Sequence, residues 1–483
     1  MFNIRTQASP AVTLLNGSMA SETITRCIPP EVLREIFSHL SSPLRLLEPY
    51  EFPWYLGQVC SEWRALFLSM QPYFWNEIQI EEPEDCDRQP DPAHVMPMLT
   101  FFLKATNGAP FSFTLYSEDY YDVHEAPKVE LILSKLLDHS MQWVNALMEL
   151  QLPEFLLLRS VKDRVPLLQS LALVLPSDEM ENHDSTLLLQ MGKLFENAPL
   201  LTRIKLECLS DVDWKFNWAS LTSLHLCSFS DSPHLIITTL RQAINLEEFS
   251  LDDTAFWDID WANIGDTATI QLPRLKYLSV EELFFLTILE TPALEELKIE
   301  VEEDKPDNTR IVIEFLLRSN CELSRLSSSY INLPVLIEIL TYTPNLEKLL
   351  LWDSKFLVDL VKWLTRSTDE AEPQELPLRR LHSLSLNCWS EIEGSDLEAV
   401  QEMVIHRDST IDKSVEGLRE LAIYTDTSWA GPSAVLKRLE SLCKDKRIDF
   451  RFIRSFDQTG SKIVQLPISI QQLGNSGPKP RAA

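Results

Sequence analysis

The clearest pattern along the chain is a recurring phrase of aliphatic residues. An aliphatic residue is followed by two variable residues, a second aliphatic, one variable residue and a third aliphatic. Because side chains alternate between the two faces of a β-strand, each copy predicts a short strand with one buried face. The copies are Leu147/Leu150/Leu152, Leu168/Leu171/Leu173, Leu201/Ile204/Leu206, Leu221/Leu224/Leu226, Leu246/Phe249/Leu251, Leu275/Leu278/Val280, Leu294/Leu297/Ile299, Leu346/Leu349/Leu351, Leu381/Leu384/Leu386 and Leu418/Leu421/Ile423, with a degraded copy at Leu323/Leu326/Ser328.

Segments with the periodicity of amphipathic helices lie between these copies. They cover residues 185–198, 335–343, 356–367, 396–406 and 433–446. A strand and a helix that each bury one face, repeated along a chain, bury those faces only against their neighbours. The sequence therefore predicts an α/β fold in which the repeated units stack, with a parallel sheet inside and helices outside.

In its strand half the phrase resembles a leucine-rich repeat, and the resemblance implies a horseshoe-shaped solenoid. The family places Asn or Cys three residues after the last aliphatic, where this chain has residues such as Leu209, Phe229 and Thr254. That residue normally bonds neighbouring loops to one another, so we expect an irregular horseshoe. Residues 101–121 predict a helix, an Asn-Gly turn and a strand that closes the first edge of the sheet.

Two short apolar helices are predicted before the repeats begin. The first lies in the segment IPPEVLREIFSHL, residues 28–40, where two prolines suit a helix start and Glu31 suits the positive end of the helix dipole. The second runs from about Trp54 to Ser69, with apolar and polar residues on opposite sides. Such a small module buries little surface, so we expect it to need a partner.

This segment resembles an F-box of the type found in fungal proteins. Its landmarks are Pro29-Pro30-Glu31-Val32, Val59-Cys60-Ser61-Glu62-Trp63 and Trp75, although the connection Ser41–Pro53 is longer than in the compact form of the family. The resemblance implies a docking surface for a Skp-type adaptor, which links F-box proteins to a cullin-RING ubiquitin ligase. The residues that it divides between adaptor contact and internal packing are Ile28, Pro29, Val32, Leu33, Ile36, Phe37, Val59, Cys60, Trp63 and Leu66.

The order of these features predicts five regions. They are a disordered N-terminus at 1–27, the F-box-like module at 28–80, an acidic, proline-rich loop at 81–97, the leucine-rich-repeat-like solenoid at 98–457 and a flexible tail at 458–483.

Charge and composition narrow the classes of partner. The formal net charge is −29, from 72 acidic and 43 basic residues in a chain of 483. An acidic surface repels phosphate backbones and anionic lipid headgroups, so we expect neither nucleic acid nor a membrane as a partner. The sequence contains no apolar run that could span a membrane and no secretion signal in its first 27 residues. We therefore expect a cytoplasmic or nuclear protein.

The residues that carry chemistry are scattered. The eight cysteines show no zinc-ligand spacing, the nine histidines occur singly, and no phosphate-binding loop or hydrolase motif is present. We expect no metal, no cofactor and no enzymatic activity.

One position in each repeat is a candidate for partner recognition. The residue after the last aliphatic points onto the concave face of the predicted horseshoe, and the residue before it adds Lys205, His225 and Lys298. This set predicts either a groove for a basic segment of a protein substrate, with aromatic anchors, or an ordinary solvated face of an acidic chain. The candidate substrate-binding residues are Glu207, Asp252, Glu281, Glu300, Trp352 and Tyr424.

Two functions follow from these expectations. In the first, the chain is the substrate-recognition subunit of a Skp-cullin-F-box ubiquitin ligase, in which the F-box docks the adaptor and the repeats bind a protein substrate. In the second, it is a non-enzymatic scaffolding protein outside any ligase, whose F-box-like helices pack back on the repeats. Binding to the adaptor separates the two.

Overall fold

The computed structural model divides the chain into two compact α/β units. The first comprises Met1–Leu201 and Val212–Asn217, and the second comprises Thr202–Asp211 and Trp218–Ala483. The predicted N-terminus 1–27, the loop residues 81–94 and the tail 458–483 lie outside the described residues. The structure describes residues 28–47, 52–70, 74–80, 95–116, 129–175, 191–209, 212–229, 233–252, 268–301, 307–352, 357–365, 377–388, 392, 394–409, 417–425 and 433–454.

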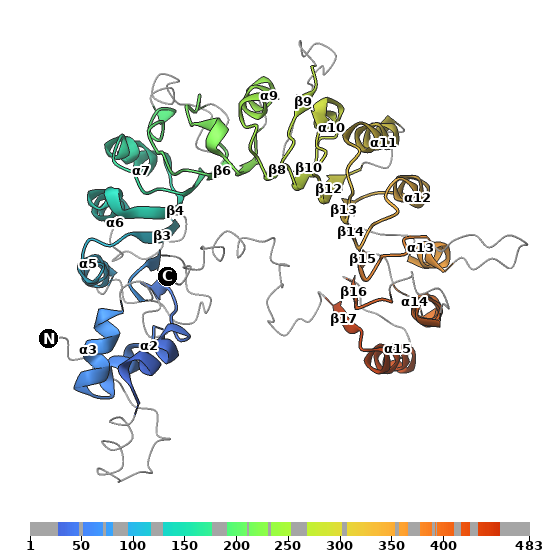
Figure 1. The fold of residues 1–483 in the computed structure, drawn as a ribbon, viewed down its shortest axis with the longest axis horizontal. Helices are drawn as coiled ribbons and strands as arrows, with labels where there is room; N and C mark the ends of the chain where they lie inside the picture. Colours follow the sequence, from blue (N-terminus) through green and yellow to red (C-terminus); the bar gives the residue numbers. More distant parts are fainter. Residues whose placement is uncertain are drawn as a thin grey trace, which may run out of the picture. The chain divides into compact units, whose positions relative to one another are not determined.

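The first unit is built on parallel strands that pair in the order of the sequence (Figure 1). These strands are β1 (Leu44–Arg45), β2 (Glu77–Ile80), β3 (Phe111–Tyr116), β4 (Trp143–Glu149) and β5 (Ser170–Val174). The helices are α2 (Pro30–Ser38), α3 (Ser61–Ser69), α5 (Val95–Ala105), α6 (Val129–Asp138) and α7 (Leu152–Leu157), with 3-10 turns η1 (Trp54–Gln58), η4 (Ser140–Gln142) and η5 (Leu158–Val161).

The second unit continues the same alternation of strand and connection. Its main sheet contains β6 (Arg203–Glu207), β7 (Ser223–Cys227), β8 (Glu248–Asp252), β10 (Tyr277–Val280), β12 (Glu296–Glu300), β13 (Arg325–Ser329), β14 (Lys348–Trp352), β15 (Ser383–Cys388), β16 (Glu420–Thr425) and β17 (Asp449–Arg454). The strands β9 (Ile270–Gln271) and β11 (Leu289–Glu290) pair separately. The helices are α9 (Pro233–Gln242), α10 (Phe284–Ile288), α11 (Asp307–Ser319), α12 (Leu333–Thr341), α13 (Leu357–Leu364), α14 (Gly394–Ser409) and α15 (Ser433–Lys446), with the 3-10 turn η7 (Trp218–Ser220).

The register of the main sheet explains why the aliphatic phrase recurs. The middle aliphatic of each copy lies opposite that of the next, and each is at most 3% exposed, whereas the flanking positions are mostly half-buried. The prediction of short strands with one buried face is therefore confirmed for this unit. The aligned residues are Ile204, Leu224, Phe249, Leu278, Leu297, Leu326, Leu349, Leu384 and Leu421.

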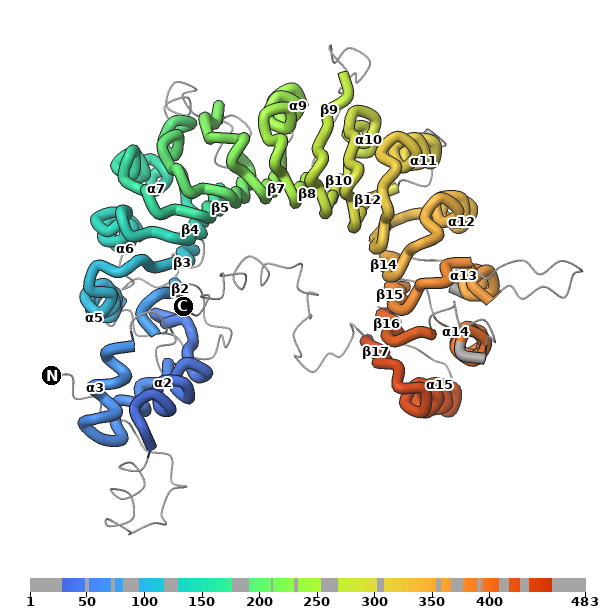
Figure 2. Tube along the Cα trace, viewed as in Figure 1, coloured from blue at the N-terminus to red at the C-terminus, as the bar shows by residue number. Residues whose placement is uncertain are grey.

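The helices of the second unit lie on one side of its strands, as Figure 2 shows for α9 to α15. In α12, for example, Leu336, Ile339 and Leu340 are buried, while Glu338 is exposed. No described helix of this unit covers the other face of the sheet (Figure 1). That face is the one on which the candidate substrate-binding residues were predicted.

Two arginines, one buried and one half-buried, connect helices of the second unit to earlier parts of the chain. Arg407 on α14 donates to the carbonyl oxygens of Leu378 and Leu381, at 2.7 and 3.3 Å. Arg318 on α11 donates in the same way to the carbonyl oxygens of Leu286 and Leu289. Burial lowers the pKa of Arg407 to about 10, so the guanidinium remains charged at neutral pH. Each arginine satisfies carbonyl groups that a regular helix or strand would have paired.

The predicted repeat at Leu147/Leu150/Leu152 is misplaced by four residues. In β4 the three core positions of the phrase are held by Trp143, Ala146 and Met148, which are at most 2% exposed. Ala146 lies opposite Leu171, the middle aliphatic of the next copy, while Leu147 lies on the other face, half-buried. The indole N–H of Trp143 donates to the carbonyl oxygen of Leu136, 3.1 Å away, which fixes the large ring on the core side.

The helix predictions hold for four of the five segments. Residues 335–343, 356–367, 396–406 and 433–446 overlap α12, α13, α14 and α15. In the fifth, 185–198, residues 185–190 lie outside the described part, and most of 191–197 forms turns. A Cβ on Gly192 would lie 2.0 Å from the carbonyl oxygen of Asp213. The backbone at Asp213 therefore packs directly against Gly192, and the predicted helix has no room for side chains at this position.

The first edge of the sheet differs from the prediction. The helix α5, a turn at Asn107 and Gly108 with φ of 51° and 82°, and the strand β3 occur as expected in 101–121. However, β3 pairs with β2, which pairs in turn with β1. The edge therefore lies at β1, inside the connection after the first helix.

Candidate functional sites

Helix α2 and the turn that ends it carry two rows of apolar side chains in different surroundings. Leu33 and Phe37 are 6% and 0% exposed, whereas Val32, Ile36 and Leu40 are 47%, 44% and 41% exposed. Residues four apart lie on the same side of a helix, so each set forms a row. The inner row packs inside the first unit, and the outer row is open to water.

The second predicted helix is divided in two. A 3-10 turn, η1, ends at Gln58, and α3 begins at Ser61. Cys60 between them is extended, with φ −157° and ψ 173°, and its Sγ accepts a hydrogen bond from the backbone N–H of Trp63 at 3.4 Å. The Cys60 side chain thus caps α3, and Trp63 packs edge-on against Phe37 with ring centroids 5.0 Å apart.

The ten predicted adaptor-contact or packing residues separate by exposure. Pro29, Val32, Ile36 and Val59 are exposed, Ile28, Cys60 and Trp63 are half-buried, and Leu33, Phe37 and Leu66 are buried. Sequence reasoning missed three further exposed apolar residues, Leu40, Tyr55 and Leu68. The spacing of Val32, Ile36 and Leu40 shows that the three share one side of the helix, but an apolar arc this wide does not show which side is packed.

An aromatic cluster joins these helices to the rest of the first unit. Phe52, Phe67 and Trp75 lie with ring centroids 5.2 to 6.0 Å apart. Phe101 of α5 packs against Trp75 and Trp54, at 5.5 and 5.9 Å. Together with the pairing of β2 and β3, these contacts differ from the expectation of a module set apart from the repeats.

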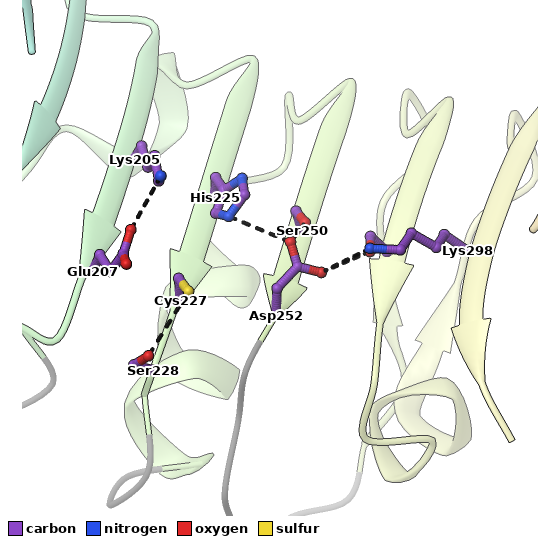
Figure 3. Close-up of polar contacts among 9 residues, drawn as sticks. Lys205, Glu207, His225, Cys227, Ser228, Ser250, Asp252 and Lys298 are labelled. Carbon is purple, nitrogen blue, oxygen red and sulfur yellow. Dashed lines mark hydrogen bonds and ion pairs between the residues drawn. The ribbon is translucent and has the colours of Figure 1, made fainter. Parts of the chain in front are cut away.

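A polar cluster lies on the open face of the second unit (Figure 3). The carboxylate of Asp252 on β8 accepts hydrogen bonds from Ser250 Oγ at 2.6 Å and Ser279 Oγ at 2.9 Å. It also pairs with His225 Nε2 at 3.3 Å and Lys298 Nζ at 3.7 Å. One carboxylate thereby joins the strands β7, β8, β10 and β12.

The remaining charges of the cluster are also paired. Lys205 Nζ lies 3.1 Å from Glu207 Oε2 on the same strand, and these side chains are 25% and 29% exposed. Burial lowers the pKa of His225, although the negative charge of Asp252 opposes the shift, so His225 is neutral at pH 7. Burial and the nearby Asp252 raise the pKa of Tyr277 to about 12. The cluster is therefore a network of partnered polar groups rather than a stripe of bare carboxylates.

The structure places the six candidate substrate-binding residues along one row of the sheet. Glu207 and Asp252 lie on either side of Cys227 in the register, and Glu300 lies opposite Ser329, which lies opposite Trp352. Glu281 directly follows β10, and Tyr424 lies in β16. All six are half-buried. Ser250 and Ser279, which bind Asp252, gave no sequence signal beyond their alternation.

Several kinds of site receive no support from the described residues. No three or more His, Cys, Asp or Glu side chains in them are grouped so that they could hold a metal ion. None of the helices in the described ranges has the length and apolar character needed to cross a bilayer.

A scan against models of protein families finds no match, and a search of curated proteins finds none either.

Proposed function

We propose that the chain is an F-box protein with a leucine-rich-repeat horseshoe, and that it serves as a substrate-recognition subunit of a Skp-cullin-F-box ubiquitin ligase. In this proposal α2 and α3 dock a Skp-type adaptor, and the open face of the second unit binds a protein substrate. The chain performs no chemistry itself. It raises the effective concentration of the substrate near the ligase.

The observation that carries this proposal is the outer row of α2. Val32, Ile36 and Leu40 are each more than 40% exposed, although they lie beside a buried row. Contiguous exposed apolar residues mark surfaces that bind another protein. The row directly follows Pro29-Pro30-Glu31, at the helix that the F-box resemblance assigns to the adaptor.

Replacement of Ile36 by Asp tests the docking surface. A charge placed in a buried apolar contact costs at least about 2 kcal/mol, so binding to a purified Skp-type adaptor should weaken about 30-fold or more. The unfolding midpoint of the free chain should stay unchanged, because Ile36 is open to water there. Phe37 is unsuitable for this test, since a charge at that buried position would unfold the module.

Arg34→Asp provides the matched control. Arg34 is exposed on the same helix but outside the outer row, so this variant places the same acidic side chain, with an even larger change in net charge, without entering the proposed contact. Adaptor affinity should be retained in Arg34→Asp and lost in Ile36→Asp. Equal affinity for the adaptor in both variants would contradict the proposal that α2 docks a Skp-type adaptor.

The scaffolding function is the second candidate, and the aromatic cluster favours it. Contacts of Trp54 and Trp75 with Phe101 pack the F-box-like helices on α5, as a scaffold of this kind would require. The two candidates differ in one measurable property: a scaffold would show no affinity for the adaptor even in the unaltered chain.

A further inference from the structure

The open face of the second unit changes in character between β12 and β14. On β6 to β12 its outward positions carry the paired charges of the polar cluster. On β14 and β16 the same positions carry Leu350, Trp352 and Tyr424, which are half-buried and are here called the apolar patch. The residues opposite Leu350 on the two neighbouring strands are Ser327 and Ser385, whose side chains are short. Large apolar side chains set among short ones suit contact with another protein.

Two serine hydroxyls on β13 lie beside the apolar patch. Ser327 lies opposite Leu350 and Ser329 lies opposite Trp352, on the same face of the sheet. Each serine is only 9% exposed, and neither hydroxyl makes a hydrogen bond to another described residue. A nearly buried hydroxyl without a partner costs free energy that a hydrogen bond recovers. Backbone N–H and C=O groups of a bound protein segment can supply these bonds.

Lys348 places a positive charge next to the apolar patch. It is exposed on β14, and no carboxylate in the described ranges pairs with it. The polar groups on either side of it already have partners, since Arg325 pairs with Glu296 at 2.6 Å and Ser383 donates to Glu420 at 2.9 Å. Lys348 can therefore pair with a carboxylate of another protein without breaking an internal ion pair.

We propose that an extended segment of a protein substrate docks across β13 to β16, with a large apolar side chain on the apolar patch and an Asp or Glu that pairs with Lys348. The backbone of the segment bonds to Ser327 and Ser329. This inference rests on the proposed function, which assigns a protein substrate to the open face. It differs from the basic segment expected from the sequence, because Glu207 and Asp252 already have cationic partners within the chain.

Selection of random short peptides displayed on phage tests the apolar patch. The library is first depleted on Trp352→Ala, which removes peptides that bind elsewhere, and is then selected on the unaltered chain. Enriched peptides should carry a large apolar residue close to an Asp or Glu, and should bind the unaltered chain about 30-fold more tightly than Trp352→Ala. Tyr342→Ala removes an exposed aromatic ring at the end of α12 and is the control. It should bind these peptides as the unaltered chain does.

Charge reversal tests the pairing with Lys348. Lys348→Glu changes an exposed side chain, so the variant should fold normally even if Trp352→Ala proved unstable. It should bind the enriched peptides about fivefold more weakly, and peptides in which the Asp or Glu is replaced by Lys should recover this loss. Lys437→Glu makes the same change in charge at an exposed position of α15 and should have no effect.

Three results would overturn the inference. If no peptide preferred the unaltered chain to both Trp352→Ala and Lys348→Glu, the apolar patch would not be a docking surface. Equal effects of Lys348→Glu and Lys437→Glu would contradict the specific pairing with a carboxylate. Enriched peptides rich in Lys and Arg, with binding that falls in Glu207→Gln but not in Lys348→Glu, would place the substrate on the polar cluster instead.

Adaptor affinity, measured on the same preparations, separates this inference from the proposed function. A chain that binds the Skp-type adaptor but selects no such peptide would lose only the docking surface described here. A chain that selects the peptides but does not bind the adaptor would lose only its role in a ubiquitin ligase.

Discussion

At the scale of single residues, Asp252 shows how one carboxylate can hold several strands together. It accepts hydrogen bonds from Ser250 and Ser279 and pairs with His225 and Lys298. The side chain is 20% exposed, so water competes with these partners only in part. Carboxylate–hydroxyl bonds in such surroundings are stronger than bonds between neutral groups. Asp252 therefore contributes to the stability of the open face whether or not it also binds a substrate.

Replacement of Asp252 by Asn should destabilise the chain. The variant keeps one oxygen acceptor but removes the charge that attracts Lys298, and its NH2 group cannot accept from a serine hydroxyl. We expect the free energy of unfolding to fall by about 1–3 kcal/mol, measured by urea denaturation.

Glu247→Gln is the control for this prediction. Glu247 pairs with Lys276 at 2.8 Å, but the two side chains are 43% and 53% exposed. Exposed pairs contribute about 0–1 kcal/mol, so this variant should change little. If both variants unfolded alike, the Asp252 network would be no stronger than an exposed ion pair.

At the scale of secondary-structure elements, β4 shows that residues other than aliphatic ones can occupy the core positions of the repeat. Trp143, Ala146 and Met148 keep the spacing of the phrase and are buried, whereas Leu147 lies on the other face. The repeat was assigned to the wrong residues here because Leu147, Leu150 and Leu152, which lie four residues further on, have the same spacing. In β7 and β12 the outward positions carry His225 and Lys298, and the phase of the pattern is unambiguous there.

Two substitutions in β4 test this register. Ala146→Asp places a charge in the core and should lower the free energy of unfolding by about 3 kcal/mol or more. Leu147→Asp, one residue away on the half-buried face, should cost about 1 kcal/mol. Thermal unfolding of the two variants compares their stabilities directly. A larger loss of stability in Leu147→Asp than in Ala146→Asp would support the register expected from the sequence instead.

The sequence was sufficient for most strands of the second unit and for four of the five helical segments between the repeats, because each buries one face with a regular period. Leu224, Phe249 and Leu278 align from the spacing of the aliphatic phrase alone. The sequence was not sufficient for the polar cluster, since the pairing of Asp252 with Lys298 requires β8, β10 and β12 to lie side by side in register. It also could not separate Val32 from Leu33, because a broad apolar arc does not reveal which side is packed.

At the scale of the whole molecule, the segment before residue 95 is part of the first unit's sheet. β2 pairs with β3 along residues Glu77–Ile80, and β1 extends the sheet by one strand. Trp75, 1% exposed, packs against Phe101 of α5. The F-box-like segment therefore protects the edge of β3 and the aromatic surface of α5.

A chain that begins at Val95 should consequently be unstable. It lacks β1 and β2 and exposes the edge of β3, so we expect a lower Tm than in the complete chain and aggregation in size-exclusion chromatography. A chain that begins at Ile28 retains every described contact and should match the complete chain. Monomeric behaviour with an unchanged Tm in the shorter chain would instead make the first helices an independent module.

The order of the strands has a consequence for biosynthesis. Within each unit, every strand of the main sheet pairs with the next strand of that sheet in the sequence. The pairing of a strand therefore does not depend on a distant part of the chain. A growing polypeptide can therefore add one layer at a time as it leaves the ribosome, at about 5–20 residues per second. During this process the most recently added strand always has one unpaired edge, and a pause in translation would prolong the exposure of that edge. Ribosome-bound intermediates arrested within the second unit, for example after β8 or β12, should thus need a chaperone more than the finished unit does.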